Sequence, residues 1–214
     1  MRITKFEHAC VRVEHDAHRI VIDPGTLTTP EAVDGATAVL ITHEHADHYA
    51  PDTLRRTDAP VFTIAAVAAK IREDAPDVAE RVTVVEPGQH LDVGVPVEVV
   101  GRTHAEILPD LHFDNSGYLL DVGGTRVFHP GDALTVPDTG VDLLLLPVSA
   151  PWLKASECIG FARDVGASRS LAIHDLVYSD FGLGVMDTHL RRILEPAGQA
   201  YERLRPGEDL GEDL

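Results

Sequence analysis

The segment 42–48, Thr-His-Glu-His-Ala-Asp-His, follows directly on the apolar run 38–41 and constrains the fold more than any other part of the chain. The apolar run predicts a buried strand that ends where the polar segment begins. The segment offers four ligand-type side chains, His43, His45, Asp47 and His48. Ligands so close in sequence cannot surround one small cation tetrahedrally, but they can serve two adjacent cations. The alternative is a His-rich surface turn, which the dense spacing after a buried strand disfavours.

Two cations need further ligands, and the rest of the chain offers three candidates. His104, Asp132 and His174 each lie just after a predicted apolar strand, as the first cluster does. Functional side chains gather at the carboxyl ends of strands in layered α/β proteins. Each of the three could instead be an ordinary polar residue at a strand end. Their shared position is what favours a common metal centre.

The charge balance limits the partners of the chain. Its 214 residues include 35 acidic and 18 basic side chains, for a net charge of −17. Such a chain repels phosphate backbones, so we expect no nucleic-acid partner. A small-molecule substrate, including an anionic one, could still reach a local site made positive by cations. A hydrophobic content of 44% over this length predicts one globular domain with a substantial core.

The apolar segments also bear on location. The first residues carry charges and no apolar core of signal-peptide length, and the longest nearly apolar stretches are 59–69 and 143–153. Both stretches are shorter than the roughly 20 residues that cross a bilayer, so we predict a cytoplasmic protein without membrane contact. Cys10 and Cys158 lie far apart among apolar residues and are expected to be reduced, buried thiols. A homo-oligomer is compatible with the sequence.

Apolar patterns alternate with turn signals along the chain and predict a mixed α/β fold. The predicted strands are 2–5, 10–14, 19–23, 38–42, 82–86, 95–101, 117–122, 126–129, 142–146 and 171–174. The predicted helices are 65–73, 155–165 and 185–194. The segment 206–214 is acidic and turn-rich, so we expect a mobile tail after a domain that spans 1–205.

Two strand–Pro–Gly segments resemble one another. Residues 21–25 read Val-Ile-Asp-Pro-Gly, and residues 127–131 read Val-Phe-His-Pro-Gly. The same offset, without gaps, aligns the apolar strand 39–41 with 145–147. This pattern predicts two similar βα halves with a site between them at the strand ends. Strand–Pro–Gly turns are common, so a chance match is the alternative.

The run H-x-H-x-D-H at 43–48, followed by a later His, a Gly-Asp pair and a final His, resembles the metallo-β-lactamase superfamily of metallohydrolases. The resemblance covers nearly the whole chain and implies a four-layer αββα sandwich of two βα halves. It assigns one metal to His43, His45 and His104, and a second metal to Asp47, His48 and His174, with Asp132 bridging the two. It also implies that Asp23 supports the site without binding metal.

Within the superfamily, the chain is most similar to a compact branch that includes ascorbate-6-phosphate lactonase and uncharacterised metal-dependent hydrolases. Class B β-lactamases have no bridging Asp where this chain has Asp132, and flavodiiron proteins usually carry Glu in place of His45. Ribonuclease Z and glyoxalase II carry RNA-binding or substrate-binding parts without a counterpart here. Residues 6–9, Phe-Glu-His-Ala, resemble the Gly-His start of the compact branch. Glu7 replaces its usual Gly, which leaves the role of His8 open.

The resemblance and the ligand types imply a metal-dependent hydrolase. Asp47 and Asp132 would cancel only part of the charge of two divalent cations, which favours a metal-bridging hydroxide. This hydroxide would attack a small ester, lactone or phosphodiester, and we expect Asp47 and Asp132 to be catalytic residues. Zinc is the expected metal, and manganese or iron also suits His and carboxylate ligands. The alternatives are a non-catalytic metal-binding or regulatory module and a nuclease of the same superfamily.

Five further side chains have weaker expectations. His129, at a strand end, is expected to be structural. His112 lies in a long loop between two candidate ligands, where a substrate contact is the alternative to a solvent-facing role. Trp152 is expected to pack in the core, with a pocket wall as the alternative. Tyr178 and Asp180 follow His174 and could line the entrance to a site.

Overall fold

The computed structural model describes residues 1–211 as two β-sheets flanked by helices. Within these residues the first sheet contains, in spatial order, β1 (Arg2–Lys5), β2 (Val11–His15), β3 (His18–Ile22), β4 (Ala38–Ile41), β5 (Val61–Thr63) and β6 (Val82–Val84). The second sheet contains β13 (Ala200–Glu202), β12 (Arg169–Ile173), β11 (Leu143–Pro147), β10 (Thr125–His129), β9 (Gly117–Val122), β8 (Pro96–Val100) and β7 (His90–Asp92).

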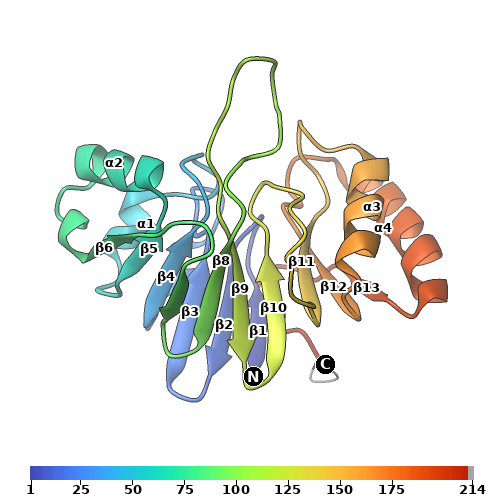
Figure 1. The fold of residues 1–214 in the computed structure, drawn as a ribbon, viewed down its shortest axis with the longest axis horizontal. Coiled ribbons are helices and arrows are strands. Elements are labelled where there is room, and N and C mark those ends of the chain that lie inside the picture. The colour runs from blue at the N-terminus through green and yellow to red at the C-terminus, as the bar shows by residue number, and fades with distance from the viewer. Residues whose placement is uncertain (212–214) are drawn as a thin grey trace.

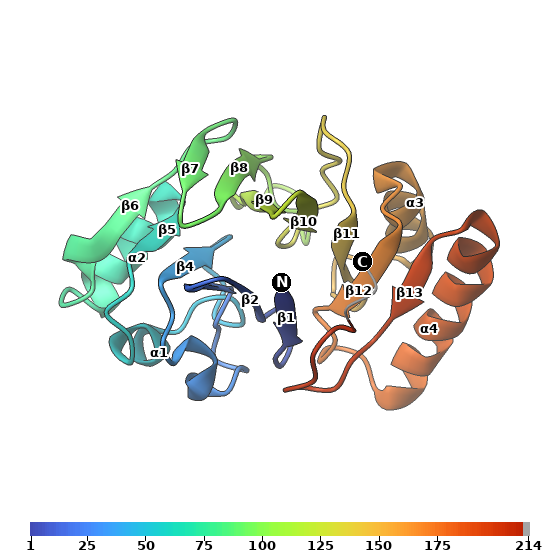
Figure 2. The same ribbon diagram turned by 90° about the horizontal axis from the view of Figure 1, so that it is seen from below.

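Helices cover the outer faces of both sheets. The helices are α1 (Pro51–Arg55), α2 (Ala65–Asp74), α3 (Ala155–Val165) and α4 (Asp180–Leu194). Figure 1 shows α1 and α2 on one flank and α3 and α4 on the other, and Figure 2 shows the two sheets between them. No helix within residues 1–211 has both the length and the apolar character needed to cross a membrane.

Buried side chains fill three layers of this sandwich. Between the sheets, residues such as Ile20 and Leu40 pack with Leu120 and Leu145 of the opposite sheet. A second apolar cluster joins the outer face of the second sheet to α3 and α4, and a third joins the first sheet to α1 and α2. The strands have apolar residues on both faces because each sheet is covered on both sides. The predicted four-layer αββα sandwich is therefore confirmed.

The two halves have the same topology. In the first half, β1, β2 and β3 are antiparallel, and β4, β5 and β6 then continue parallel to β3. In the second half, β8, β9 and β10 are antiparallel, and β11, β12 and β13 continue parallel to β10. The gapless alignment of the second strands is wrong, since Val21 pairs with Val39 but Val127 pairs with Leu143. The residue that pairs with Val127 therefore lies two positions earlier in the chain than the gapless alignment predicts.

Most predicted elements are present, and the differences have local causes. The strands β5, β7 and β13 span only three residues each, too few for an alternating pattern to be recognised. Helix α4 begins at Asp180 rather than at 185, and the Ser179 side chain accepts a hydrogen bond from the Gly182 backbone at its start. Gly182 and Gly184 lower the helix propensity of residues 180–184, so the sequence pattern did not predict a helix there.

Residues 207–210, which belong to the segment expected to form a mobile tail, lie against the first strand. The Leu210 amide donates to the Ile3 carbonyl at 2.8 Å, and the Lys5 amide donates to the Glu208 carbonyl at 3.0 Å. The Leu210 side chain is buried in the cluster between the sheets. Strand β1 lies at the edge of the first sheet, and this segment supplies the hydrogen bonds that its free edge would otherwise lack. The last residues, 212–214, lie outside the described part of the chain.

Candidate metal centre

Loops at the carboxyl ends of strands bring all seven predicted ligands together. The loop after β4 carries His43, His45, Asp47 and His48. His104 follows β8, Asp132 follows β10 and His174 follows β12. The side chains form two groups whose candidate ligand atoms lie within 4.8 Å of one another: His43, His45, His104 and Asp132 in one, and His8, Asp47, His48 and His174 in the other.

The first group is built around the imidazole of His43. Its Nε2 atom lies 3.0 Å from Nδ1 of His45 and 4.0 Å from Oδ2 of Asp132. Nε2 of His104 lies 3.4 Å from the same carboxylate oxygen. His43 and His104 are buried, whereas His45 is partly exposed. These atoms therefore converge from three loops on one point at the rim of the domain.

The second group is built around Asp47. Its Oδ2 atom lies 3.0 Å from Nε2 of His8, 3.5 Å from Nε2 of His174 and 3.7 Å from Nε2 of His48. The sequence left the role of His8 open, and the structure places it, fully buried, directly against Asp47. In the sequence, the only indication that His8 belongs to the site was the His-Ala pair at positions 8 and 9, shortly after the first strand.

The carboxylate of Asp132 lies between the two groups. Its Oδ1 atom is 3.2 Å from Nε2 of His48, and its Oδ2 atom is 3.2 Å from Nε2 of His174. Its Oδ2 atom also faces His104 of the first group. The carboxylate of Asp132 therefore contacts both groups: Oδ1 faces His48 of the second group, and Oδ2 faces His104 of the first group and His174 of the second. This is the position that a bridging ligand requires.

The unpaired atoms of the centre fit divalent cations. Of the ten buried side-chain atoms without a hydrogen-bond partner in the described chain, five belong to the two groups: Nδ1 of His8, Nε2 of His48, Nε2 of His104, Nε2 of His174 and Oδ1 of Asp132. A buried polar atom without a partner carries a desolvation cost, so several pointing at one place need an explanation. Imidazole nitrogens and carboxylate oxygens are the donors that zinc, manganese and iron bind. The residues present therefore fit a pair of such ions.

The opposite ring nitrogens of four histidines are held by the protein. Nδ1 of His48 lies 2.7 Å from Oδ2 of Asp23, and Nδ1 of His43 lies 3.0 Å from the Thr42 hydroxyl. The Thr42 hydroxyl itself donates to Asp23 at 2.7 Å, so it accepts from His43. Nδ1 of His104 and of His174 are hydrogen-bonded to the carbonyls of Ala105 and Ser149. A proton on Nδ1 leaves Nε2 with its lone pair facing the centre.

The protein charges of the centre stabilise one another. Burial alone would lower the pKa of His48, but Asp132 and Asp23 outweigh it and hold this pKa well above its usual range. Burial likewise opposes a charged His174, yet Asp132 and Asp47 raise its pKa to about 9. Burial would raise the pKa of Asp132, but His48 and His174 keep it well below the ordinary value. Cations that bind here therefore compete with protons on His48 and His174.

Left-handed backbone occurs at three residues of the site. The φ angles of His8, Asp23 and His174 are 58°, 51° and 54°. This conformation is rare for residues other than glycine and persists only where the surrounding structure holds it. The backbone around His174 is held by its amide, which donates to the His8 carbonyl at 2.9 Å. Two residues of one group are thus fixed to each other through the main chain.

The weaker expectations have mixed outcomes. His129 has the predicted structural place: it is buried, with Nε2 2.9 Å from the Ala9 carbonyl, and its Nδ1 accepts from the Gly131 amide. His112 and Asp180 are exposed. The Tyr178 hydroxyl donates to the carbonyl of Leu153 at 3.1 Å. Trp152 packs in the outer apolar cluster, as expected, but its indole also donates to Asp132, a contact that the sequence did not indicate.

A cavity of about 450 Å³ lies beside Trp152, and none of the candidate ligands themselves lines it. Its lining includes Ala105, Leu134 and Trp152, which are neighbours or contacts of the candidate ligands His104 and Asp132. It is lined further by Glu106, Ile107, Lys154 and Glu157. The cavity has the size of a small-molecule site, and its walls combine apolar and charged groups.

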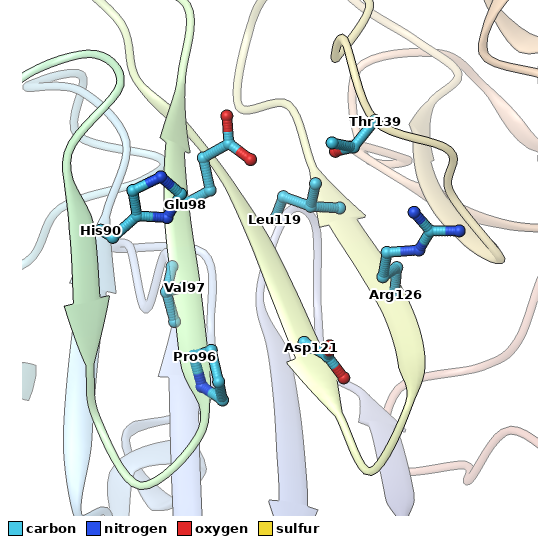
Figure 3. A pocket seen from close by; sticks show the side chains of 8 residues that line it. All are labelled: His90, Pro96, Val97, Glu98, Leu119, Asp121, Arg126 and Thr139. Atoms are coloured by element: carbon cyan, nitrogen blue, oxygen red, sulfur yellow. The ribbon is translucent and has the colours of Figure 1, made fainter.

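A second hollow, of about 170 Å³, lies over strands β7 to β10 on the second sheet. Figure 3 shows its lining side chains, among them His90, Glu98 and Arg126. None of the candidate metal ligands lines it. This hollow is separate from the centre, and the chemistry of the site does not involve it.

Comparisons with known proteins agree with this geometry. The model of a family described as the Beta-lactamase superfamily domain matches residues 2–174. Protein Rv0786c of Mycobacterium tuberculosis is 35% identical over 193 residues, which cover 86% of this chain and 89% of that protein. A UPF0173 metal-dependent hydrolase of Thermus thermophilus is 29% identical over 155 residues, covering 66% and 68% of the two chains. The fold is similar to Igni18, a metallo hydrolase of Ignicoccus hospitalis, with a TM-score of 0.74, 22% identity, and coverage of 98% and 97%.

Proposed function

The chain belongs to the β-lactamase superfamily, and we propose that it is a metal-dependent hydrolase acting on a small ester, lactone or phosphodiester. One observation carries this proposal. Buried nitrogens from three loops, together with Oδ1 of Asp132, lack partners and face a common point. A domain that only needed stability would not gather so many unpaired polar atoms. The names of relatives such as the Thermus thermophilus hydrolase support the same class of reaction.

The proposed centre holds two divalent cations. His43, His45 and His104 would bind one of them, and Asp47, His48 and His174 the other. Asp132, which contacts both groups, would bind both. His8 lies against Asp47, and it would either orient this carboxylate or add a nitrogen ligand to the second ion. Zinc suits this donor set best, and manganese or iron is the alternative.

Divalent cations in such a centre lower the pKa of water and polarise the oxygen of a scissile ester or phosphodiester. The chain's own residues prepare this chemistry. Asp47 and Asp132 supply negative charge without cancelling that of two divalent ions. Asp23 holds both His48 and the Thr42 hydroxyl, and so fixes two loop residues at once. The cavity beside Trp152 would receive the part of a small substrate that does not react.

Metal analysis joined to a substrate panel tests the proposal. The purified chain is expected to bind two zinc equivalents and to hydrolyse at least one of p-nitrophenyl acetate, a homoserine lactone, a thioester and bis-p-nitrophenyl phosphate. Asp132→Ala is expected to lose this turnover and part of the metal. Asp164→Ala, which removes an exposed aspartate on α3, is the matched control and keeps both. An Asp132→Ala protein that is active without metal would overturn the proposal, and turnover of RNA alone would favour the nuclease.

A further inference from the structure

Trp152 contacts the centre through a single hydrogen bond. It lies in the loop between β11 and α3, and its indole Nε1 donates to Oδ2 of Asp132 at 3.0 Å. The ring is 6.0 Å from that of His104 and 6.3 Å from that of His174, measured between centroids. The side chain is only 8% exposed, so water does not compete freely for the indole N–H. A tryptophan thus stands beside both halves of the candidate centre.

The loop that carries Trp152 is fixed independently of Asp132. The Tyr178 hydroxyl reaches the carbonyls of Ala150 and Leu153, on either side of the indole. The Leu153 amide also donates to the Ala150 carbonyl at 3.2 Å. These contacts fix the main chain on either side of Trp152, and the ring itself packs in the outer apolar cluster. Trp152 can therefore act as a rigid donor whose place is set mainly by the packing of its ring.

Apart from the histidines of the centre, the carboxylate of Asp132 has one side-chain partner. Its backbone amide donates to Oδ1 of Asn115 at 3.0 Å, which fixes the main chain but not the side-chain torsions. Within residues 1–211, Trp152 is the one side chain outside the two candidate ligand groups that hydrogen-bonds this carboxylate. With Oδ2 held there, Oδ1 faces His48 and keeps no hydrogen-bond partner. One oxygen is held by the indole, while the other faces the His48 imidazole.

We propose that Trp152 is a positioning residue that fixes the orientation of Asp132 and thereby sets the metal affinity of the centre. The proposal rests on the function proposed above. A ligand already held in its binding orientation loses less conformational freedom when a cation binds. Partners that orient metal ligands typically contribute about 10- to 100-fold to metal affinity. The indole N–H would therefore matter even though Trp152 itself binds no metal.

Trp152→Phe tests the inference, because it keeps an aromatic ring in the apolar cluster and removes the N–H. Zinc affinity is measured by competition with a chromophoric chelator, and the folding of each metal-free protein by its urea midpoint. We expect Trp152→Phe to bind zinc about 10-fold or more weakly than the natural chain, within the range known for such partners. Tyr178→Phe is the control, because it loosens the same loop while keeping the indole N–H. We expect it to lose much less affinity.

Two results would overturn the inference while leaving the proposed hydrolase intact. One is wild-type zinc affinity in Trp152→Phe, and the other is an equal loss in Tyr178→Phe, which would assign the effect to the loop. A natural chain that binds no zinc, manganese or iron would instead overturn the proposed function, and this inference with it. The three outcomes are therefore distinguishable in one set of titrations.

The fluorescence of the protein gives a second measurement. Trp152 is the only tryptophan in the chain, so tryptophan emission reports on the surroundings of this one indole. Zinc that binds Asp132 changes the charge next to the indole N–H, and we expect a saturable change in emission that parallels the chelator titration. Emission that stays constant while zinc binds would contradict a contact between Trp152 and a metal-binding Asp132.

Discussion

Single hydrogen bonds at Nδ1 orient four histidines of the candidate centre, His43, His48, His104 and His174. Residue type and position at strand ends allowed all seven candidate ligands to be identified in the sequence. The groups behind them could not be identified, because two are the backbone carbonyls of Ala105 and Ser149, which carry no side-chain signal. The sequence did not indicate the Trp152 contact for another reason. A tryptophan can pack in an apolar cluster and still hydrogen-bond Asp132 through its indole N–H, so the expected core position gave no sign of the hydrogen bond.

Asp23→Asn is expected to weaken metal binding without removing a ligand. Asp23 accepts from the Thr42 amide at 2.8 Å, from the Thr42 hydroxyl at 2.7 Å and from His48 at 2.7 Å. An amide has one acceptor oxygen, so its NH₂ group would face a donor. We expect a loss of about 10- to 100-fold in zinc affinity, measured by chelator competition. Asp164→Asn, on the exposed face of α3, is the control. Unchanged affinity in Asp23→Asn would contradict the orienting role.

The buried pair of Lys5 and Asp175 predicts a pH-dependent stability. Lys5 is fully buried, with Nζ 3.2 Å from Oδ1 of Asp175, and burial lowers its pKa from 10.5 although Asp175 opposes the shift. Asp175→Asn should lower this pKa further and destabilise the metal-free protein at pH 7 by about 2 kcal/mol. A lysine with a depressed folded pKa destabilises fully below that pKa, and the penalty shrinks as the pH rises from the folded pKa toward the unfolded value of 10.5.

Urea unfolding at pH 7 and pH 10 in the presence of a chelator measures this effect. The difference between the natural chain and Asp175→Asn should be smaller at pH 10 than at pH 7, because the lowered pKa of Lys5 leaves less of it charged at the higher pH. Asp52→Asn removes an exposed partner of Arg55 and should change little at either pH. An Asp175→Asn penalty that is the same at both pH values would show that the charge of Lys5 is not involved.

The secondary-structure elements follow from apolar patterning only where they are long enough. Strand β9 and helix α3 have the predicted bounds, because β9 is a nearly continuous buried run and α3 repeats its buried positions at helical spacing. Helix α1 spans five residues, and β5 lies within a stretch that is apolar throughout, so neither had a distinctive period. The pairing of short strands depends on neighbours that the local sequence does not contain. Element order was therefore easier to predict than the complete sheets.

The turn after β3 packs directly on the loop of candidate ligands, which gives Gly25 a specific role. A Cβ atom at Gly25 would lie 1.9 Å from the Asp47 carbonyl oxygen, and backbone atoms cannot yield as a flexible side chain can. Gly25→Ala should destabilise the protein by about 1–3 kcal/mol and displace Asp47, lowering zinc affinity. Gly160→Ala in α3 is the control, since a Cβ there meets nothing within 4 Å and should stabilise by about 0.5–1 kcal/mol. Equal urea midpoints for the two variants would contradict this packing.

The centre exists only because both halves of the molecule contribute to it. The half with β1 to β6 supplies the ligand loop and His8, and the half with β8 to β13 supplies His104, Asp132 and His174. The internal repeat in the sequence predicted such a meeting of halves, since equivalent strand ends reach the same rim of the sandwich. It did not predict which atoms would bridge them. That depends on loop conformations, among them the left-handed backbone of His8 and His174.

The C-terminal segment ties the end of the second half to the first strand of the other half, so its removal should destabilise the whole molecule. Gly207 and Leu210 donate backbone hydrogen bonds to Lys5 and Ile3, and Leu210 is buried between the sheets. A chain that ends at residue 205 should lose on the order of 3 kcal/mol, mostly from the exposure of Leu210 and of the edge of β1. For a domain of this size, that loss lowers the thermal midpoint by roughly 6–12 °C. Leu210→Ala should show part of the same loss, because it keeps the backbone hydrogen bonds. A shortened chain with the thermal midpoint of the full one would mean that these contacts do not stabilise the domain, and that the segment acts as the tail predicted from its composition.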